Sequence, residues 1–68
     1  MSTASNYVHL DVEEIVRETE AAFLLRLESG EEVWMPKSQI ADWNELLEGD
    51  QNCTVSVTEF IAREKGLT

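Results

Sequence analysis

Short apolar runs separated by turn residues dominate the pattern along this chain. The run at residues 21–27 is apolar on both alternating faces, which suits a strand covered on two sides, although its leucines and alanines also suit a helix. Ser29-Gly30 follows, and a second run at residues 31–36 ends at Pro36, which cannot donate a hydrogen bond to a ladder. Two runs joined by a two-residue loop with a glycine predict a β-hairpin.

Two further segments carry strand signals. Residues 11–18 give a weak signal, because their apolar side chains stand among acids and an arginine. Residues 52–58 alternate cleanly, so that Cys53, Val55 and Val57 share one face and the polar residues share the other. The second segment therefore predicts a half-buried strand.

The last apolar segment predicts a short helix. Residues 59–65 follow Thr58, which is a good N-cap, and they end before Gly66. Their acid comes early and their lysine late, as the helix dipole prefers. We expect Phe60 and Ile61 to dock this helix on the sheet.

The order β-β-β, loop, β, short helix predicts a mainly β fold. We expect a small twisted antiparallel sheet, or an SH3-like partly closed barrel, of about four to five strands with a short C-terminal helix. Residues 1–6 are small and polar and predict a disordered start, and residues 7–68 predict one small domain.

The polar segment at residues 42–49 predicts a helical turn or an ordered loop. Asp42 can cap it, Glu45 stands three residues later as in a capping box, and Gly49 can end it. Trp43 lies inside this segment. It either covers the open end of the barrel or projects as an anchor for a partner.

The turn positions predict which side chains share a face. If the turns centre on Thr19-Glu20 and Ser29-Gly30, three cross-strand rows lie on one face. These rows are Ile15, Leu24 and Met35; Arg17, Ala22 and Lys37; and Glu13, Arg26 and Val33. The opposite face carries the heavier apolar set, which is the predicted core: Val16, Phe23, Leu25, Leu27 and Trp34.

The first of these faces is a candidate contact surface for a partner. Its predicted contact residues are the apolar strip Ile15, Leu24 and Met35 and the flanking cations Arg17, Arg26 and Lys37, with Trp43 added from the loop. Alternatively, the C-terminal helix covers the strip and the cations only shield its edges. A slip of one residue in either turn would exchange the two faces.

Charge narrows the choice of partner. Fourteen acids against five Lys and Arg give a net charge of -9, which repels nucleic acid and anionic membranes. The carboxylates are either a solvated surface or an imitation of a phosphate backbone. A lone cysteine, and a start without a secretory signal or spanning segment, predict a cytoplasmic protein.

Catalytic, metal and cofactor sites are not predicted. With one histidine, His9, and one cysteine, Cys53, neither a zinc set nor a nucleophile and base pair can be argued. Cys53 alternates with valines and is expected to act as a small buried hydrophobe. We therefore expect a protein that is not an enzyme.

The block at residues 33–40, Val-Trp-Met-Pro-Lys-Ser-Gln-Ile, and the segment at residues 55–67, which ends in Lys-Gly-Leu, support a resemblance. The chain resembles a group of small, functionally uncharacterised bacterial and phage proteins with a Trp-x-Pro-Lys-Ser-Gln-Ile block. The resemblance implies a small stand-alone domain in a phage or mobile-element setting, and it does not supply an activity. Lys37-Ser38-Gln39 is then a structural corner, with Ser38 and Gln39 bonding the turn backbone, or a contact loop.

Three functions remain open at this point. The first is a protein-binding module, an accessory factor or subunit of a larger complex. The second is an acidic mimic of nucleic acid that inhibits a defence or repair enzyme. The third is a single-stranded nucleic-acid binder that uses Arg17, Arg26 and Lys37, which the net charge of -9 opposes. We expect a protein partner and no membrane, and self-association remains open.

Overall fold

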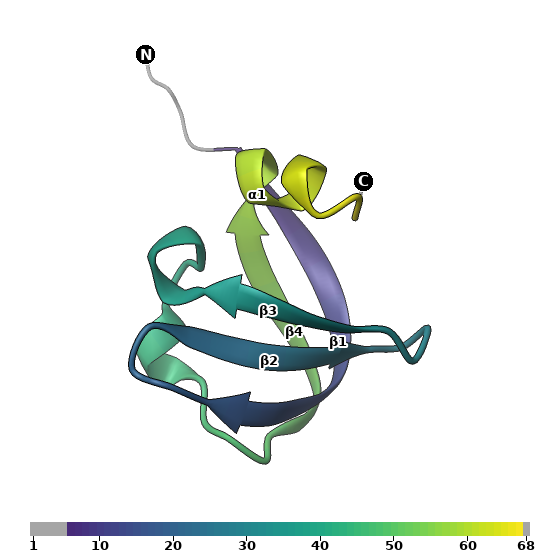
Figure 1. Ribbon diagram of the computed structural model, residues 1–68, viewed down its shortest axis with the longest axis vertical. Coiled ribbons are helices and arrows are strands. Elements are labelled where there is room, and N and C mark those ends of the chain that lie inside the picture. Colours follow the sequence, from purple (N-terminus) through teal and green to yellow (C-terminus); the bar gives the residue numbers. More distant parts are fainter. Residues whose placement is uncertain (1–5, 68) are drawn as a thin grey trace.

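The computed structural model describes residues 6–67, which form a mainly β structure. Its elements are β1 (Tyr7–Glu18), β2 (Ala22–Leu27), β3 (Glu32–Pro36), the 3-10 helices η1 (Lys37–Gln39) and η2 (Trp43–Glu45), β4 (Gln51–Thr58) and α1 (Glu59–Glu64). The four strands form one twisted, unclosed antiparallel sheet in the order β3-β2-β1-β4 (Figure 1). The predicted mainly β fold with a short C-terminal helix is confirmed.

The predicted disordered start falls almost wholly outside the described residues. Asn6 is the one described residue of that segment, and its carbonyl accepts a hydrogen bond of 3.0 Å from the Glu59 amide. Asn6 therefore belongs to the ordered part of the chain, because it caps one of the free amides at the start of α1.

The long strand β1 is the centre of the sheet. It pairs with β4 between Tyr7 and Glu14 and with β2 between Val12 and Glu18. Bulges interrupt its ladder with β2, and bulges bend a strand and increase its twist. The sheet curls so far that Ile40, after η1, forms an isolated bridge with Val57 of β4.

The core fills the inner face of this curled sheet. Its buried hydrophobic residues are Leu10, Val12, Ile15, Phe23, Leu25, Val33, Met35, Ile40, Val55, Val57, Ile61 and Ala62. Cys53 is half-buried against this cluster, which confirms that it shares a face with Val55 and Val57. Within residues 6–67, the helices are all too short to span a bilayer.

The C-terminal helix docks with other residues than expected. Thr58 caps α1 as predicted, because its Oγ1 accepts a hydrogen bond of 3.3 Å from the Ile61 amide. Ile61 and Ala62 are buried, whereas Phe60 is 65% exposed. The predicted docking by Phe60 is wrong, because successive side chains of a helix point about 100° apart and only one side of this short helix meets the sheet.

The first turn lies one residue later than predicted. The Thr19 amide donates to the Ala22 carbonyl at 2.8 Å, so the turn centres on Glu20 and Ala21. The bulges in β1 then shift the register along the strand. As a result, Leu24 lies opposite Arg17 rather than Ile15.

The second turn is also different from the prediction. The Leu27 amide donates to the Glu31 carbonyl at 2.8 Å, which leaves a three-residue loop instead of the expected two-residue loop. Gly30 ends this loop with φ +93°, a conformation that suits glycine. Leu24 consequently lies opposite Trp34 rather than Met35.

The new register overturns part of the predicted face assignment. Ile15 and Met35 have no exposed surface and belong to the core, whereas the sequence predicted them on the contact face. Phe23 and Leu25 are buried as predicted. Trp34 was predicted in the core but is 44% exposed, because the odd shift turns it to the other side of the sheet.

The segment between η1 and β4 is an ordered turn. Trp43–Glu45 forms one 3-10 turn, in line with the predicted helical turn. Asp42 does not cap it through its side chain, since this residue adopts a left-handed conformation with φ 55°. The Asp50 carboxylate instead accepts a hydrogen bond of 3.0 Å from the Leu47 amide and holds the following loop.

Candidate partner-binding surface

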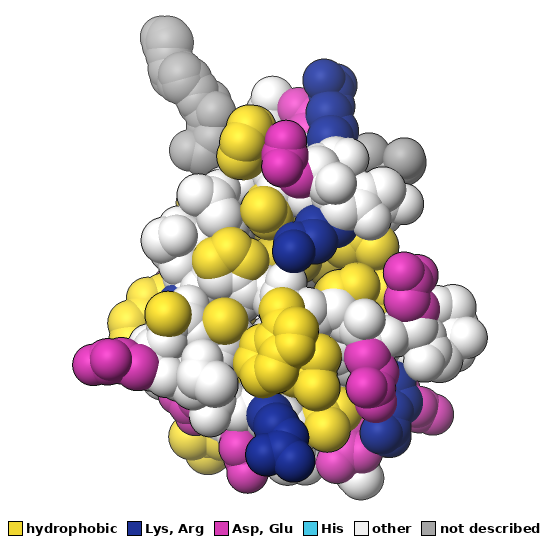
Figure 2. Space-filling model, viewed as in Figure 1, with side chains coloured by type: hydrophobic (Ala, Val, Ile, Leu, Met, Phe, Trp, Pro, Cys, Tyr) yellow, Lys and Arg dark blue, Asp and Glu magenta, His cyan; other side chains and the backbone are white. Residues whose placement is uncertain are grey.

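The outer face of β1, β2 and β3 carries an apolar surface. Arg17, Leu24 and Trp34 lie in one cross-strand row, and Val16 stands beside Arg17 at a bulge of β1. We call these four residues the Trp34 face. Figure 2 shows hydrophobic side chains gathered over β2 and β3, with Lys or Arg side chains below them.

No element in the described part of the chain packs over the Trp34 face. The helix α1 packs against β4 and β1 at one end of the sheet (Figure 1). Trp34 is 44% exposed, and Leu24 and Val16 are half-buried. The predicted alternative, in which the C-terminal helix covers the strip Ile15, Leu24 and Met35, holds only in part: Ile61 and Ala62 of α1 join Ile15 and Met35 in the core, whereas Leu24 lies on the other face.

The neighbouring row of the outer face is charged, and it sets one arginine between two acids. Arg26 Nη1 lies 3.2 Å from Glu14 Oε1, and Arg26 Nη2 lies 3.0 Å from Glu32 Oε2. The hydrogen bond to Glu32, together with the charges of Glu32, Glu14 and Glu13, raises the pKa of Arg26 above its ordinary value. Two carboxylates thus hold this guanidinium in place.

Arg17 differs from Arg26. It is exposed, and among the described residues it forms no ion pair. Its row places it opposite Leu24, which separates it from Trp34 on the next strand. Among residues 6–67, Arg17 is therefore the cation of the outer face that is free to meet a partner, and it lies at the border of the Trp34 face.

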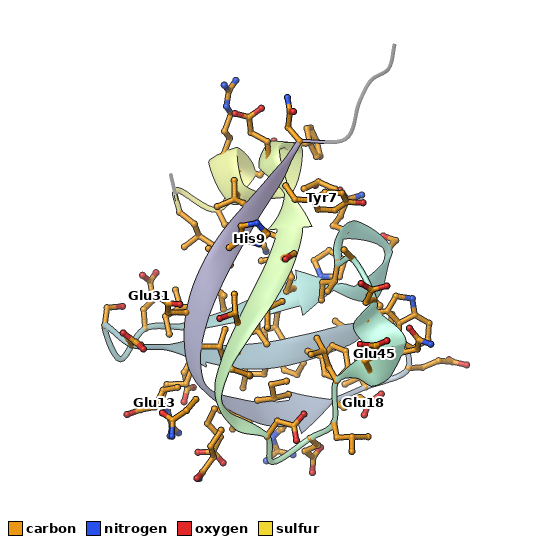
Figure 3. The ribbon with its side chains drawn as sticks, turned by 180° about the vertical axis from the view of Figure 1, so that it is seen from behind. Tyr7, His9, Glu13, Glu18, Glu31 and Glu45 are labelled. Atoms are coloured by element: carbon orange, nitrogen blue, oxygen red, sulfur yellow. The ribbon has the colours of Figure 1, made fainter. Side chains whose placement is uncertain are left out.

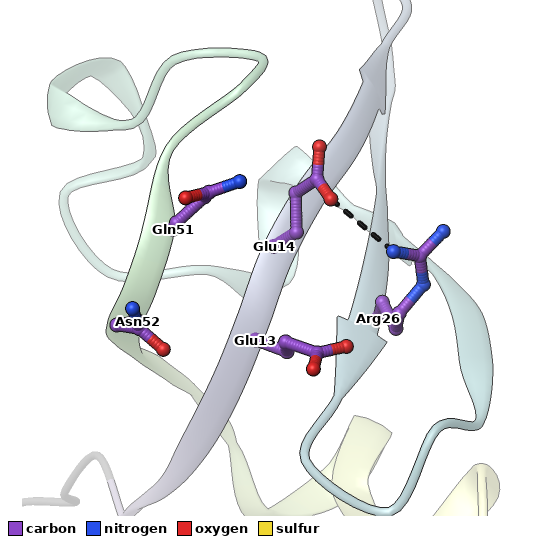
Figure 4. A pocket seen from close by; sticks show the side chains of 5 residues that line it. All are labelled: Glu13, Glu14, Arg26, Gln51 and Asn52. Carbon is purple, nitrogen blue, oxygen red and sulfur yellow. Dashed lines mark hydrogen bonds and ion pairs between the residues drawn. The ribbon is translucent and has the colours of Figure 1, made fainter.

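A polar hollow lies at the edge of the charged row. It has a volume of about 300 Å³ and is lined by Glu13, Glu14, Arg26, Gln51 and Asn52. Figure 4 shows the Glu14 carboxylate turned toward Arg26, with the two amide side chains on the neighbouring strand. Within residues 6–67, no group of three His, Cys, Asp or Glu side chains could hold a metal ion.

Lys37 and Trp43 form a corner rather than a contact strip. Lys37 Nζ lies 2.7 Å from Glu18 Oε2, 5.0 Å from the Phe23 ring centroid and 4.9 Å from the Trp43 ring centroid. The lysine side chain is only 11% exposed. These ion-pair and cation–π contacts hold Trp43 against the end of the core, although Trp43 itself remains 42% exposed.

Gln39 also makes η1 a structural corner. The Thr58 hydroxyl donates to Gln39 Oε1 at 2.6 Å, so Gln39 ties η1 to the start of α1. Ser38 is exposed. The predicted bonds from Ser38 and Gln39 to the turn backbone are not found among residues 6–67; Lys37 and Gln39 instead bond other elements and hold the corner.

The predicted contact residues thus separate into three groups. Arg17, Leu24 and Arg26 share the outer face, Lys37 and Trp43 share the corner, and Ile15 and Met35 are buried. Trp34 was predicted in the core and is instead a surface residue. The signal that could have found it is the length of the loop at Gly30, because this length sets the face of every residue in β3.

The structure also brings His9 and Ser56 together. They lie opposite each other on β1 and β4, with His9 Nδ1 2.7 Å from Ser56 Oγ. A nucleophile and base pair normally has a third group that orients the base. In the described ranges no carboxylate is hydrogen-bonded to the other ring nitrogen. The contact itself joins β1 to β4 through polar side chains.

The acids surround the molecule instead of forming one patch. Figure 3 shows Glu13, Glu18, Glu31 and Glu45 on different sides of it. Glu14, Glu18, Glu32 and Glu59 are engaged by Arg26, Lys37 and Arg63. Three of the chain's five cations are thus committed to ion pairs within the protein.

No protein-family model, curated protein or solved structure matches the chain.

Proposed function

We propose that the protein is a non-enzymatic protein-binding module, an accessory factor or subunit of a larger bacterial or phage complex. The Trp34 face is its contact surface. The observation that carries this proposal is the exposure of Trp34, 44%, at the middle of a strand whose outer face is uncovered among residues 6–67. Trp and Arg are the residue types most enriched at binding hot spots.

The make-up of the Trp34 face supports a protein partner. The Trp34 indole beside Leu24, with Val16 across β2, supplies apolar area, and Arg17, which forms no ion pair among residues 6–67, supplies a cation at its border. Protein interfaces commonly combine an apolar centre with a polar rim. A nucleic-acid strand is a weaker candidate, because the net charge of -9 opposes it and Arg26 and Lys37 are already paired.

An acidic inhibitor that occupies a basic groove is the second candidate. The commitment of Arg26, Lys37 and Arg63 to acids favours it, since it leaves few cations to interrupt the negative surface. The spread of the acids around the molecule weighs against it, because a groove meets only one side (Figure 3). The two candidates make opposite predictions for the same set of variants.

Affinity capture with matched variants tests the proposal. Trp34→Ala should weaken capture of the specific partner at least about tenfold, because it removes the anchor of the face. Phe60→Ala removes an aromatic side chain that is 65% exposed on α1, and it should capture the partner as the wild type does. Both variants should keep the wild-type circular dichroism spectrum.

The opposite outcome would favour the acidic inhibitor. In that case Trp34→Ala would retain full capture, and reversing Glu45 and Glu48, or Glu31 and Glu32, to lysine would abolish it. Equal losses for Trp34→Ala and Phe60→Ala would contradict the Trp34 face as the contact surface.

A further inference from the structure

The strand β3 has one open side. It is the terminal strand in the sheet order, and among residues 6–67 it pairs only with β2. The bonds from Leu27 N–H to Glu31 O and from Lys37 N–H to Ala21 O show which β3 residues face β2. In an antiparallel ladder, hydrogen-bonded pairs alternate with non-hydrogen-bonded pairs. The backbone N–H and C=O groups of Val33 and Met35 therefore point toward β2, and those of Glu32 and Trp34 point away from it.

The open side of β3 has no partner in the described part of the chain. No backbone hydrogen bond from residues 6–67 reaches Glu32 or Trp34 from another segment. The open side of β4 is different, because the Ala41 amide donates to the Ser56 carbonyl at 2.9 Å. A row of unpaired N–H and C=O groups is a template for another strand.

The open side of β3 adjoins the Trp34 face. Trp34 presents its backbone groups to the open side and its indole to the outer face. A strand added here would place its own side chains next to the indole, because cross-strand neighbours on one face lie about 5 Å apart. Pro36 lacks an N–H and so limits the added strand at one end.

The charges around the open side favour a basic occupant. Glu28 and Glu31 are exposed at the hairpin tip, and neither forms an ion pair within residues 6–67. The whole chain carries a net charge of -9. A second copy of the chain would bring the same charge to the same edge, so like charges would oppose a pairing of two β3 strands.

Resting on the proposed function, we infer that the partner contributes an extended segment with alternating apolar and Lys or Arg residues. This segment adds to β3 as a fifth strand. Main-chain hydrogen bonds to Glu32 and Trp34 give the segment its register, and contact with the indole and the hairpin acids selects its side chains.

A synthetic peptide of about eight residues, with valine and lysine in alternation, tests this edge by amide hydrogen exchange. At saturating peptide the amides of Glu32 and Trp34 should exchange at least about tenfold more slowly. The amides of Val33 and Met35, which already face β2, should change little. The same peptide N-methylated on the residues that face β3 should give no slowing, and a valine and glutamate peptide should give less than the lysine peptide.

The exchange data can also overturn the inference. Absence of slowing at Trp34, or equal slowing by the N-methylated peptide, would show that the edge does not accept a strand. Slowing that depends on the concentration of the protein alone would identify a second copy as the occupant. Each of these three results would reject a basic segment at β3.

A second pair of variants separates this inference from the proposed function. Glu32→Pro removes an N–H that points away from β2, whereas Glu32→Ala loses the same ion pair to Arg26 and keeps the N–H. Relative to Glu32→Ala, Glu32→Pro should weaken capture of the partner about fivefold, the effect of one lost hydrogen bond. If Trp34→Ala loses the partner but Glu32→Pro keeps it, the Trp34 face stands and the added strand is wrong.

Discussion

Both faces of β2 carry apolar side chains, yet one face is buried in the core and the other is partly exposed. Phe23 and Leu25 point inward and have no exposed surface, whereas Leu24 between them points outward and is only half-buried. An inward side chain meets residues from β1, β3 and β4, while within residues 6–67 an outward side chain meets only its neighbours in the sheet. Apolar composition therefore does not identify the core side of a strand; the cross-strand partners do.

The outer side of β2 also differs from the solvated face of an ordinary half-buried sheet. Such a face normally carries polar residues in alternation with the core. Here Leu24 lies beside Trp34, so the fold leaves a large indole and a leucine on the side that no described element covers. An exposed apolar patch of this kind is typical of an interaction site.

Truncation of one residue on each side of β2 should give the largest difference. Phe23→Ala should lower the free energy of unfolding by about 3–5 kcal/mol, because it leaves a cavity in the core. Leu24→Ala should lower it by about 1 kcal/mol, since its side chain is partly in water already. Urea denaturation followed by circular dichroism measures both.

A domain of this size has a total stability of only about 5 kcal/mol. Phe23→Ala is therefore expected to be largely unfolded at room temperature, while Leu24→Ala remains folded. Similar losses for the two variants would contradict the register that places these residues on opposite sides of the sheet.

The loop between β2 and β3 should show a smaller effect. Gly30 has φ +93°, and a Cβ added there would meet no atom within 4 Å. Gly30→Ala should therefore cost about 1–2 kcal/mol through backbone strain alone. This loss corresponds to a fall in Tm of about 4–8 °C per kcal/mol for a small domain. Asparagine tolerates the left-handed conformation better than alanine, so Gly30→Asn should lower the Tm less.

If Gly30→Ala and Gly30→Asn have the same Tm as the wild type, the left-handed conformation of residue 30 does not stabilise the three-residue loop. The loop sets the register of β3, and the register places Trp34 on the outer face. That result would therefore contradict the proposed reason for the outward position of Trp34.

The loop at Gly30 also explains which parts of the fold the sequence could predict. The order of strands and helix follows from apolar periodicity and from local signals such as Thr58 before α1, and these signals act over a few residues. Register depends on loop length and on bulges, which the sequence pattern does not display. The hairpin was recognised, but the length of its loop was not.

The same limit applies to the candidate site. Arg17, Leu24 and Arg26 were predicted together and do share the outer face. Ile15 and Met35 were assigned to that face through the shifted register and are instead in the core. Trp34 was assigned to the core because an apolar side chain in mid-strand is usually buried, and only the pairing with Leu24 shows the contrary.

The smallest predicted effect concerns Cys53, at the rim of the inner face. Burial raises the pKa of its thiol above the ordinary value, and the charge of Asp50 adds to this shift. A group whose pKa is higher in the folded state stabilises the fold less as pH rises through its unfolded pKa, because only the unfolded chain then releases the proton easily. Between about pH 8 and pH 10, the wild type should lose more stability than Cys53→Ala.

Thiol reactivity gives the direct measurement of this shift. The rate of reaction with Ellman's reagent follows the thiolate population, so its midpoint in pH should lie higher for the native protein than for the protein in concentrated urea. Cys53→Ala has no thiol to titrate. In the stability measurement it therefore controls for the other groups that titrate at alkaline pH. Equal midpoints in the two states would place Cys53 in water, outside the inner face, and would move the boundary between the two sides of the sheet to Val55.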